Sequence, residues 1–189
     1  RVMKKINTSK DNIRFVNICL DNGVDFLVMG GTAVFFYGCR KGKGLNDLDL
    51  MPSTSPENAA RLMTALKQAG VSTNKFTVEE LQQPKQRVCL KPPNYNYDVD
   101  ILMPWAEWLY AEFRGRSEIA RIGPAAVRVL SKCDLIITKE CAVNDLESDA
   151  VMCPDKAGML KAKAEKHRED LTCLRRTEGS TLVRVNGKS

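Results

Sequence analysis

The chain has 189 residues, of which 43% are hydrophobic and 28% are charged, a balance typical of a globular protein with one sizeable core. No apolar run has the length of a bilayer-spanning helix, and no secretory signal peptide follows Arg1, so we expect no membrane partner. The net charge of +6 and the pI near 9.0 favour anionic partners such as nucleotides or RNA, or else describe only a generic basic surface.

The seven cysteines indicate the redox environment of the protein. Their number is odd, and no two of them have C-x-x-C spacing. This pattern favours reduced, mostly buried thiols in a cytoplasmic protein over disulfides or a zinc site. The cysteines are Cys19, Cys39, Cys89, Cys133, Cys141, Cys153 and Cys173.

The first half of the chain alternates helices with strands. Serine caps and terminal glycines predict helices at 9–22 and 55–69. Between these two helices we expect a buried strand at 24–29, a turn at 30–31, a short helix at 33–37, a basic loop at 39–44 and a strand at 45–51.

The second half carries further strands and then helices. We expect two short strands within 71–91, a strand at 97–103, a helix around Trp105 and Trp108, and a last strand at 126–130. Ser131 with Asp134 resembles a capping box that opens a helix. Residues 143–153 look like a loop or a broken helix, and the longest helix starts at Pro154.

This order of elements predicts an α+β protein with a mixed β-sheet under helical cover. We expect residues 1–130 to form the core and residues 131–176 to form C-terminal helices packed on it. Residues 177–189 are rich in polar and small side chains, which favours a flexible tail.

Three aspartates form the first candidate site. Asp47 and Asp49 lie one residue apart in a strand, so both carboxylates point to one face. Such a pair can hold two divalent ions about 3.5–4 Å apart, and oxygen ligands suit Mg²⁺ better than zinc. A third carboxylate is expected from an adjacent strand, with Asp100 as first candidate and Asp98 as reserve. An Asp-x-Asp pair is often only a solvated strand end, but three carboxylates in apolar strands need a cation or basic partners.

The glycine pair Gly30-Gly31 forms the second candidate site. Without Cβ atoms it lets backbone N–H groups approach phosphate oxygens, and Thr32 can add a hydroxyl donor; the alternative is a simple tight turn. Arg40, Lys41 and Lys43 follow in a loop, where they either meet the β- and γ-phosphates or stay solvated.

The predicted C-terminal helices contribute further candidate site residues. Lys139 and the run Lys166–Asp170 either face the same cleft or belong to a charged helix face. His167, the only histidine, lies on the apolar seam of the last predicted helix, which favours a packed histidine over a catalytic one.

Taken together, these segments resemble the nucleotidyltransferase superfamily, which has the polymerase-beta-like fold. The family pattern is hydrophobic–Gly–Gly/Ser, then Asp–hydrophobic–Asp/Glu, then a later hydrophobic–Asp–hydrophobic strand. The chain supplies Val28–Thr32, Asp47–Leu50 and Val99–Ile101 in that order. Residues 26–70 look closest to small stand-alone bacterial members. These include abortive-infection toxins, minimal nucleotidyltransferase antitoxins and antibiotic-modifying enzymes.

The resemblance implies a mixed sheet of about five or six strands with helices on one side and a C-terminal helical appendage. It also implies Mg²⁺-dependent transfer of a nucleoside monophosphate from a nucleoside triphosphate, such as ATP, to an acceptor hydroxyl. The acceptor is left open between RNA or tRNA, a protein, and a small molecule such as an antibiotic. The resemblance assigns catalysis and two Mg²⁺ ions to Asp47, Asp49 and Asp100, and nucleotide binding to Gly30, Gly31, Thr32, Arg40, Lys43 and Lys139.

Two other function classes remain open. The chain is alternatively a binding module, one half of a toxin–antitoxin pair that docks through an apolar surface around Trp105 and Trp108. It is alternatively a basic RNA-binding protein that acts by charge alone, which predicts an affinity that falls steeply with salt and survives loss of the acids.

Overall fold

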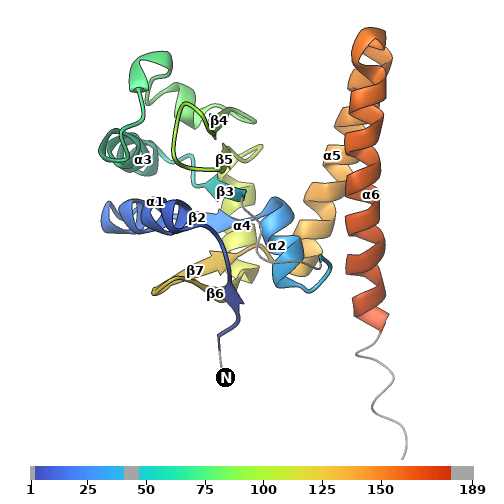
Figure 1. The fold of residues 1–189 in the computed structure, drawn as a ribbon, viewed down its shortest axis with the longest axis horizontal. Coiled ribbons are helices and arrows are strands. Elements are labelled where there is room, and N and C mark those ends of the chain that lie inside the picture. The colour runs from blue at the N-terminus through green and yellow to red at the C-terminus, as the bar shows by residue number, and fades with distance from the viewer. Residues whose placement is uncertain (1–2, 41–46, 180–189) are drawn as a thin grey trace, which may run out of the picture.

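The computed structural model describes residues 3–40 and 47–179, and Figure 1 shows the arrangement of the elements. The strands are β1 (Lys5–Ile6), β2 (Phe26–Val28), β3 (Leu48–Pro52), β4 (Arg87–Leu90), β5 (Val99–Leu102), β6 (Glu118–Ile122) and β7 (Ala125–Val129). The α-helices are α1 (Lys10–Asp21), α2 (Gly30–Phe36), α3 (Pro56–Gln68), α4 (Glu107–Arg116), α5 (Lys132–Met152) and α6 (Ala157–Gly179). Short 3₁₀ turns occupy Thr73–Lys75, Glu80–Gln82 and Pro154–Lys156.

The strands of the described residues form one mixed sheet in the order β1-β6-β7-β2-β3-β5-β4. At its centre, β2 runs antiparallel to β3 and parallel to β7, and β3 runs parallel to β5. The predicted α+β class with a mixed sheet is therefore confirmed. The sheet places β3 and β5, the two strands that carry the predicted acids, side by side.

The strand count differs from the prediction, because these ranges contain seven strands rather than five or six. The additional strands are β1 and β6, which pair with each other. β1 is only two residues long, and β6 has an apolar residue, Ile119, at an exposed position, so neither has a strong periodic signal. The hairpin between β6 and β7 is marked in the sequence only by Gly123-Pro124, where Gly123 has φ +57°. Within 71–91 the structure has one strand, β4, and two 3₁₀ turns instead of the two predicted strands.

Three helices begin at the serines that the sequence analysis selected. The side chains of Ser9, Ser55 and Ser131 each accept a hydrogen bond from the backbone N–H three residues later, at distances of 3.1, 3.3 and 3.1 Å. These bonds satisfy N–H groups that have no partner within the helix. The predicted starts of α1, α3 and α5 are confirmed.

The end of α5 differs from the prediction. A loop or broken helix was predicted at 143–153, but α5 continues to Met152. The polar residues of this segment are weak helix formers, yet the segment packs lengthwise on α6, where Ala150 and Ala164 are buried. Ion pairs of Arg168 with Glu147 and of Arg175 with Glu140 run along the same antiparallel contact. Tertiary packing therefore outweighs the local helix propensity.

Figure 1 shows α1 and α3 side by side on one side of the sheet and the long α5–α6 pair on the other, with α2 between the sheet and that pair. Helix α6 runs through Gly179, three residues into the segment predicted as a flexible tail. In the described ranges, no helix combines the length and apolarity that a membrane crossing requires.

Candidate functional site

The two central acids are neighbours across the sheet. Asp49 of β3 and Asp100 of β5 are direct partners in a parallel pairing, so their side chains leave the same face of strands that lie about 4.8 Å apart. Asp47 lies just before β3, and its charge acts on Asp49. The structure thus brings Asp49 and Asp100 side by side from two separate segments of the chain.

Asp98, the reserve candidate, lies outside the β3–β5 register. Its side chain pairs with Lys91 at 3.0 Å, and its backbone exchanges hydrogen bonds with the side chain of Asn12 at 2.9 and 3.1 Å. Asp98 therefore anchors the start of β5, and Asp100 is the acid that lies beside Asp49.

The glycine pair packs directly on Asp49. The backbone N–H of Gly31 donates to Asp49 Oδ2 at 2.8 Å, and a Cβ at Gly30 would come within 2.5 Å of Asp49 Cγ. Gly30 also has φ +59°, a backbone conformation that favours glycine. In this structure the glycines therefore make room for a carboxylate, and Thr32 donates to the backbone oxygen of Asp47 at 3.0 Å.

The environment of Asp49 opposes its ionisation. Burial raises the pKa of Asp49 above its usual range, the hydrogen bond from Gly31 lowers it in part, and the charges of Asp47 and Asp100 raise it again. Like-charged carboxylates held together in a partly desolvated place are stabilised by a cation.

Asp100 has two basic partners at the edge strand β4, one within the strand and one directly after its last residue, Leu90. Arg87 Nη2 lies 3.0 Å and Lys91 Nζ 3.1 Å from Asp100 Oδ2, and Cys89 is the direct strand partner of Asp100. Burial raises the pKa of Asp100, but the hydrogen bond with Cys89 and the charge of Arg87 outweigh burial and hold the pKa below its usual range. Oδ1 of Asp100 is buried and has no hydrogen-bond partner among the described residues. Neither Arg87 nor Cys89 was predicted as a site residue, although their spacing of two places them on one face of β4.

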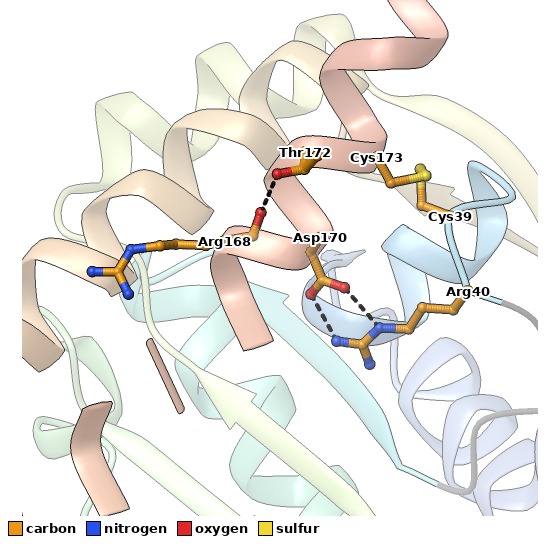
Figure 2. Close-up of a disulfide and its surroundings, with 6 residues drawn as sticks. All are labelled: Cys39, Arg40, Arg168, Asp170, Thr172 and Cys173. Atoms are coloured by element: carbon orange, nitrogen blue, oxygen red, sulfur yellow. Dashed lines mark hydrogen bonds and ion pairs between the residues drawn. A yellow bond between two sulfur atoms is a disulfide. The ribbon is translucent and has the colours of Figure 1, made fainter. Parts of the chain in front are cut away.

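A second cluster lies around Asp170 of α6. Asp170 accepts two hydrogen bonds from Arg40, from Nε at 2.9 Å and from Nη2 at 2.7 Å, and a third from Lys139 Nζ at 2.8 Å. Lys139 also lies 3.1 Å from Nδ1 of His167. Figure 2 shows the paired contact of Arg40 with Asp170. This cluster is largely shielded from water, since Asp170 is 5% and Lys139 4% exposed.

Burial shifts the titration of this cluster. It lowers the pKa of Lys139, against the opposing pull of Asp170, and burial together with the charge of Lys139 lowers the pKa of His167 to about 4. His167 is therefore neutral at pH 7, and its Nδ1 accepts from Lys139. The packed role expected for His167 agrees with this arrangement, and Lys139 turns inward to this cluster rather than outward on a charged helix face.

The two clusters meet at α2. The charge of Lys139 acts on Asp49, and Nη1 of Arg40 lies only 2.5 Å from the place where a Cβ of Gly31 would be. Of the predicted nucleotide-binding residues, the structure brings together Gly30, Gly31, Thr32, Arg40 and Lys139. Lys43 lies outside the described residues.

The cysteines depart from the prediction. Cys39 and Cys173 form a disulfide, with their Cα atoms 5.5 Å apart (Figure 2). Of the thiols outside this bond, Cys19 is buried, whereas Cys89 and Cys153 are exposed. The expectation of reduced, mostly buried thiols is therefore wrong. The bond joins positions 134 residues apart in sequence, so cysteine spacing could not reveal it.

A metal ion needs several ligand side chains close together. Among residues 3–40 and 47–179, no three acidic, histidine or cysteine side chains are close enough together to hold one. Asp49 instead accepts from Gly31, and Asp100 pairs with Arg87 and Lys91. The donor set still fits a hard cation such as Mg²⁺, because it consists of carboxylate oxygens and because the buried Oδ1 of Asp100 has no partner within residues 3–40 and 47–179.

Comparison with protein-family models, with curated proteins and with solved structures found no match.

Proposed function

We propose that the protein is a nucleotidyltransferase with the polymerase-beta-like fold, which transfers a nucleoside monophosphate from a nucleoside triphosphate to an acceptor hydroxyl in a Mg²⁺-dependent reaction. The observation that carries the proposal is the β3–β5 register, which puts Asp49 beside Asp100 with Gly30-Gly31 packed against them. If the glycines formed only a tight turn and Asp47-x-Asp49 were only a solvated strand end, there would be no reason for Asp49, Asp100 and the glycine pair to lie together.

The carboxylates of Asp47, Asp49 and Asp100 would hold the metal. Bound there, Mg²⁺ would supply positive charge for the triphosphate and for the leaving pyrophosphate. Asp49 now accepts the Gly31 N–H at 2.8 Å. A turn of this carboxylate toward a cation would free that N–H for a phosphate oxygen. The acid group and the glycine pair would then act as one unit.

The basic side chains give the reacting phosphates their electrostatic environment. Arg40 and Lys139 reach the α2 region from two separate segments and converge on Asp170. Their charges favour a bound polyanion, and a guanidinium can bind phosphate with two parallel hydrogen bonds. Because Arg87 and Lys91 keep Asp100 ionised, Asp100 can accept a hydrogen bond from the attacking hydroxyl, which orients that hydroxyl toward the α-phosphorus.

One observation favours a second candidate function, the partner-binding module. Trp108 on α4 is 67% exposed, and Lys85 Nζ lies 5.8 Å from the ring of Trp105. An exposed tryptophan is a common anchor of protein interfaces. This candidate predicts co-purification with the product of a neighbouring gene and its loss in Trp108→Ala, whereas Asp47→Ala would keep the partner.

The decisive experiment incubates the protein with each labelled nucleoside triphosphate, Mg²⁺ and total cell extract. We expect label in one fraction, whose chemistry identifies the acceptor as RNA, protein or small molecule. Asp47→Ala and Asp100→Asn should abolish the label, and chelation of the metal should do the same. Asp98→Asn is the matched control, because it removes a nearby carboxylate that pairs only with Lys91 among the ion pairs seen. Retention of full transfer by Asp47→Ala would disprove the proposal.

A further inference from the structure

We propose that the Cys39–Cys173 disulfide is a site of thiol–disulfide exchange that latches Arg40 over Gly31, and that a dithiol reductant opens this latch. The inference rests on the proposed function for its consequence, which is easier entry of a triphosphate into the reduced protein. The latch itself is a property of the chain and can be observed without any nucleotide.

The disulfide and an ion pair join the same two segments. Cys39 directly precedes Arg40, and Cys173 follows Asp170 by three residues, about one turn of α6. Figure 2 shows the sulfur–sulfur bond and the Arg40–Asp170 contact side by side. A covalent bond at one residue therefore holds the neighbouring guanidinium within reach of its carboxylate, which raises the effective concentration of one partner at the other.

The latched Arg40 lies where the glycine pair is open. Its Nε and Nη2 are both bound to Asp170, at 2.9 and 2.7 Å, and its side chain is only 17% exposed. Its Nη1 fills the space that a Cβ of Gly31 would take, at 2.5 Å. A phosphate group that approaches the Gly31 N–H would meet this guanidinium while two of its three nitrogens are engaged elsewhere. In the oxidised protein, the Arg40 guanidinium therefore blocks the approach of a phosphate group to the Gly31 N–H from this side.

The bond is accessible to a reductant, because Cys39 and Cys173 are both only partly buried. In the exchange, a thiolate of the dithiol attacks one protein sulfur, and the other cysteine leaves as a thiolate. The second thiol of the reductant then attacks the mixed disulfide. Two electrons pass to the protein, both cysteines become thiols by taking up a proton each, and the reductant becomes a disulfide.

Reduction removes the covalent tether and leaves the Arg40–Asp170 ion pair between the two segments. Without the tether, this pair must compete with water and with any anion that binds Arg40. A triphosphate has a greater affinity for the state in which Arg40 is free, so it shifts the population toward that state. We expect reduced protein to bind inorganic tripolyphosphate with Mg²⁺ roughly fivefold or more tightly than oxidised protein.

The first test needs no nucleotide. Peptide mapping without reductant should yield a Cys39–Cys173 cross-link, and hydrogen exchange of peptides spanning residues 30–40 should accelerate when the wild-type protein is reduced. Cys39→Ser/Cys173→Ser should exchange as reduced wild type does, with or without oxidant. Cys153→Ser is the matched control: it is exposed and precedes α6, and Cys173 lies about 24 Å further along that helix from Ala157.

The second test measures tripolyphosphate binding with Mg²⁺ by calorimetry in the same proteins. Tighter binding to reduced wild type and to the double variant, with Cys153→Ser behaving as wild type, supports the latch. Equal affinity in both redox states together with unchanged exchange overturns the latch and leaves the proposed function standing. Accelerated exchange with no tripolyphosphate binding in either state supports the latch and overturns the proposed function. Absence of the cross-linked peptide from oxidised protein overturns the latch directly.

Discussion

Replacement of Asp170 by asparagine tests how much stability the Arg40–Asp170–Lys139 cluster provides. Asp170 is 5% exposed and accepts three hydrogen bonds from two cations. Asparagine has nearly the same volume and keeps one acceptor oxygen, but it carries no charge. Lys139, itself 4% exposed, would then lose its ion pair and keep the neutral ring of His167 and the attraction of Asp49, so most of the compensation for its buried charge would be lost.

The size of the effect follows from that burial. Removal of one partner from a buried ion pair costs roughly 3–5 kcal/mol, because the remaining charge stays desolvated. Two features reduce the cost here: Arg40 is 17% exposed and can regain water, and burial already lowers the pKa of Lys139, so Lys139 can lose its proton. We therefore expect Asp170→Asn to lower the free energy of unfolding by about 3 kcal/mol, a large share of the typical total of about 5–15 kcal/mol.

Urea unfolding of the oxidised protein, followed by circular dichroism, measures this change as a shift of the midpoint at constant slope. Glu57→Gln is the control, because it breaks the exposed Arg61–Glu57 pair, whose side chains are 46% and 76% exposed, and should cost about 0.3–0.5 kcal/mol. A loss below about 1 kcal/mol in Asp170→Asn, close to the control, would refute the reasoning, since it would mean that water already compensates the cluster.

Two further predictions concern the glycine pair and the histidine. Gly30→Ala should cost about 3 kcal/mol in urea unfolding, because it adds backbone strain and displaces Asp49 from the Gly31 N–H. Gly70→Ala, which has φ +76° and open space around it, should cost only about 1 kcal/mol, and equal losses would contradict a close Gly30–Asp49 approach. Because burial and Lys139 lower the pKa of His167 from 6.5 to about 4, the unfolded chain binds more protons between these pH values, and stability falls as the pH decreases through them. His167→Asn should remove about 2 kcal/mol of the loss between pH 7 and 4.5; parallel pH profiles of the two proteins would show that His167 titrates normally.

Local chemistry in the sequence determined where several elements begin and which side chains share a face. Ser9, Ser55 and Ser131 cap helices because a hydroxyl three residues before an unpaired N–H satisfies it without help from the rest of the fold. Asp47 and Asp49 were predicted to share a face because side chains alternate along any strand. The α+β class followed from the order of such elements.

Tertiary structure decided which of these pieces meet. The pairing of Asp49 with Asp100 depends on the β3–β5 register, and the pairing of Asp100 with Arg87 depends on β4 as the neighbouring edge strand. Strand periodicity predicts on which face of the sheet a side chain lies, but it does not predict which residue of the next strand pairs with it.

The Asp170 cluster and the disulfide depend on the return of α6 to the end of α2, across 134 residues of sequence. The continuation of α5 through its polar segment depends on the same helix, because its packing on α6 outweighs weak helix propensity. The sequence by itself determined the candidate acids and glycines, whose spacing is local. Their neighbours and their charge balance were decided only in the folded chain, where contacts between distant segments set burial and pairing.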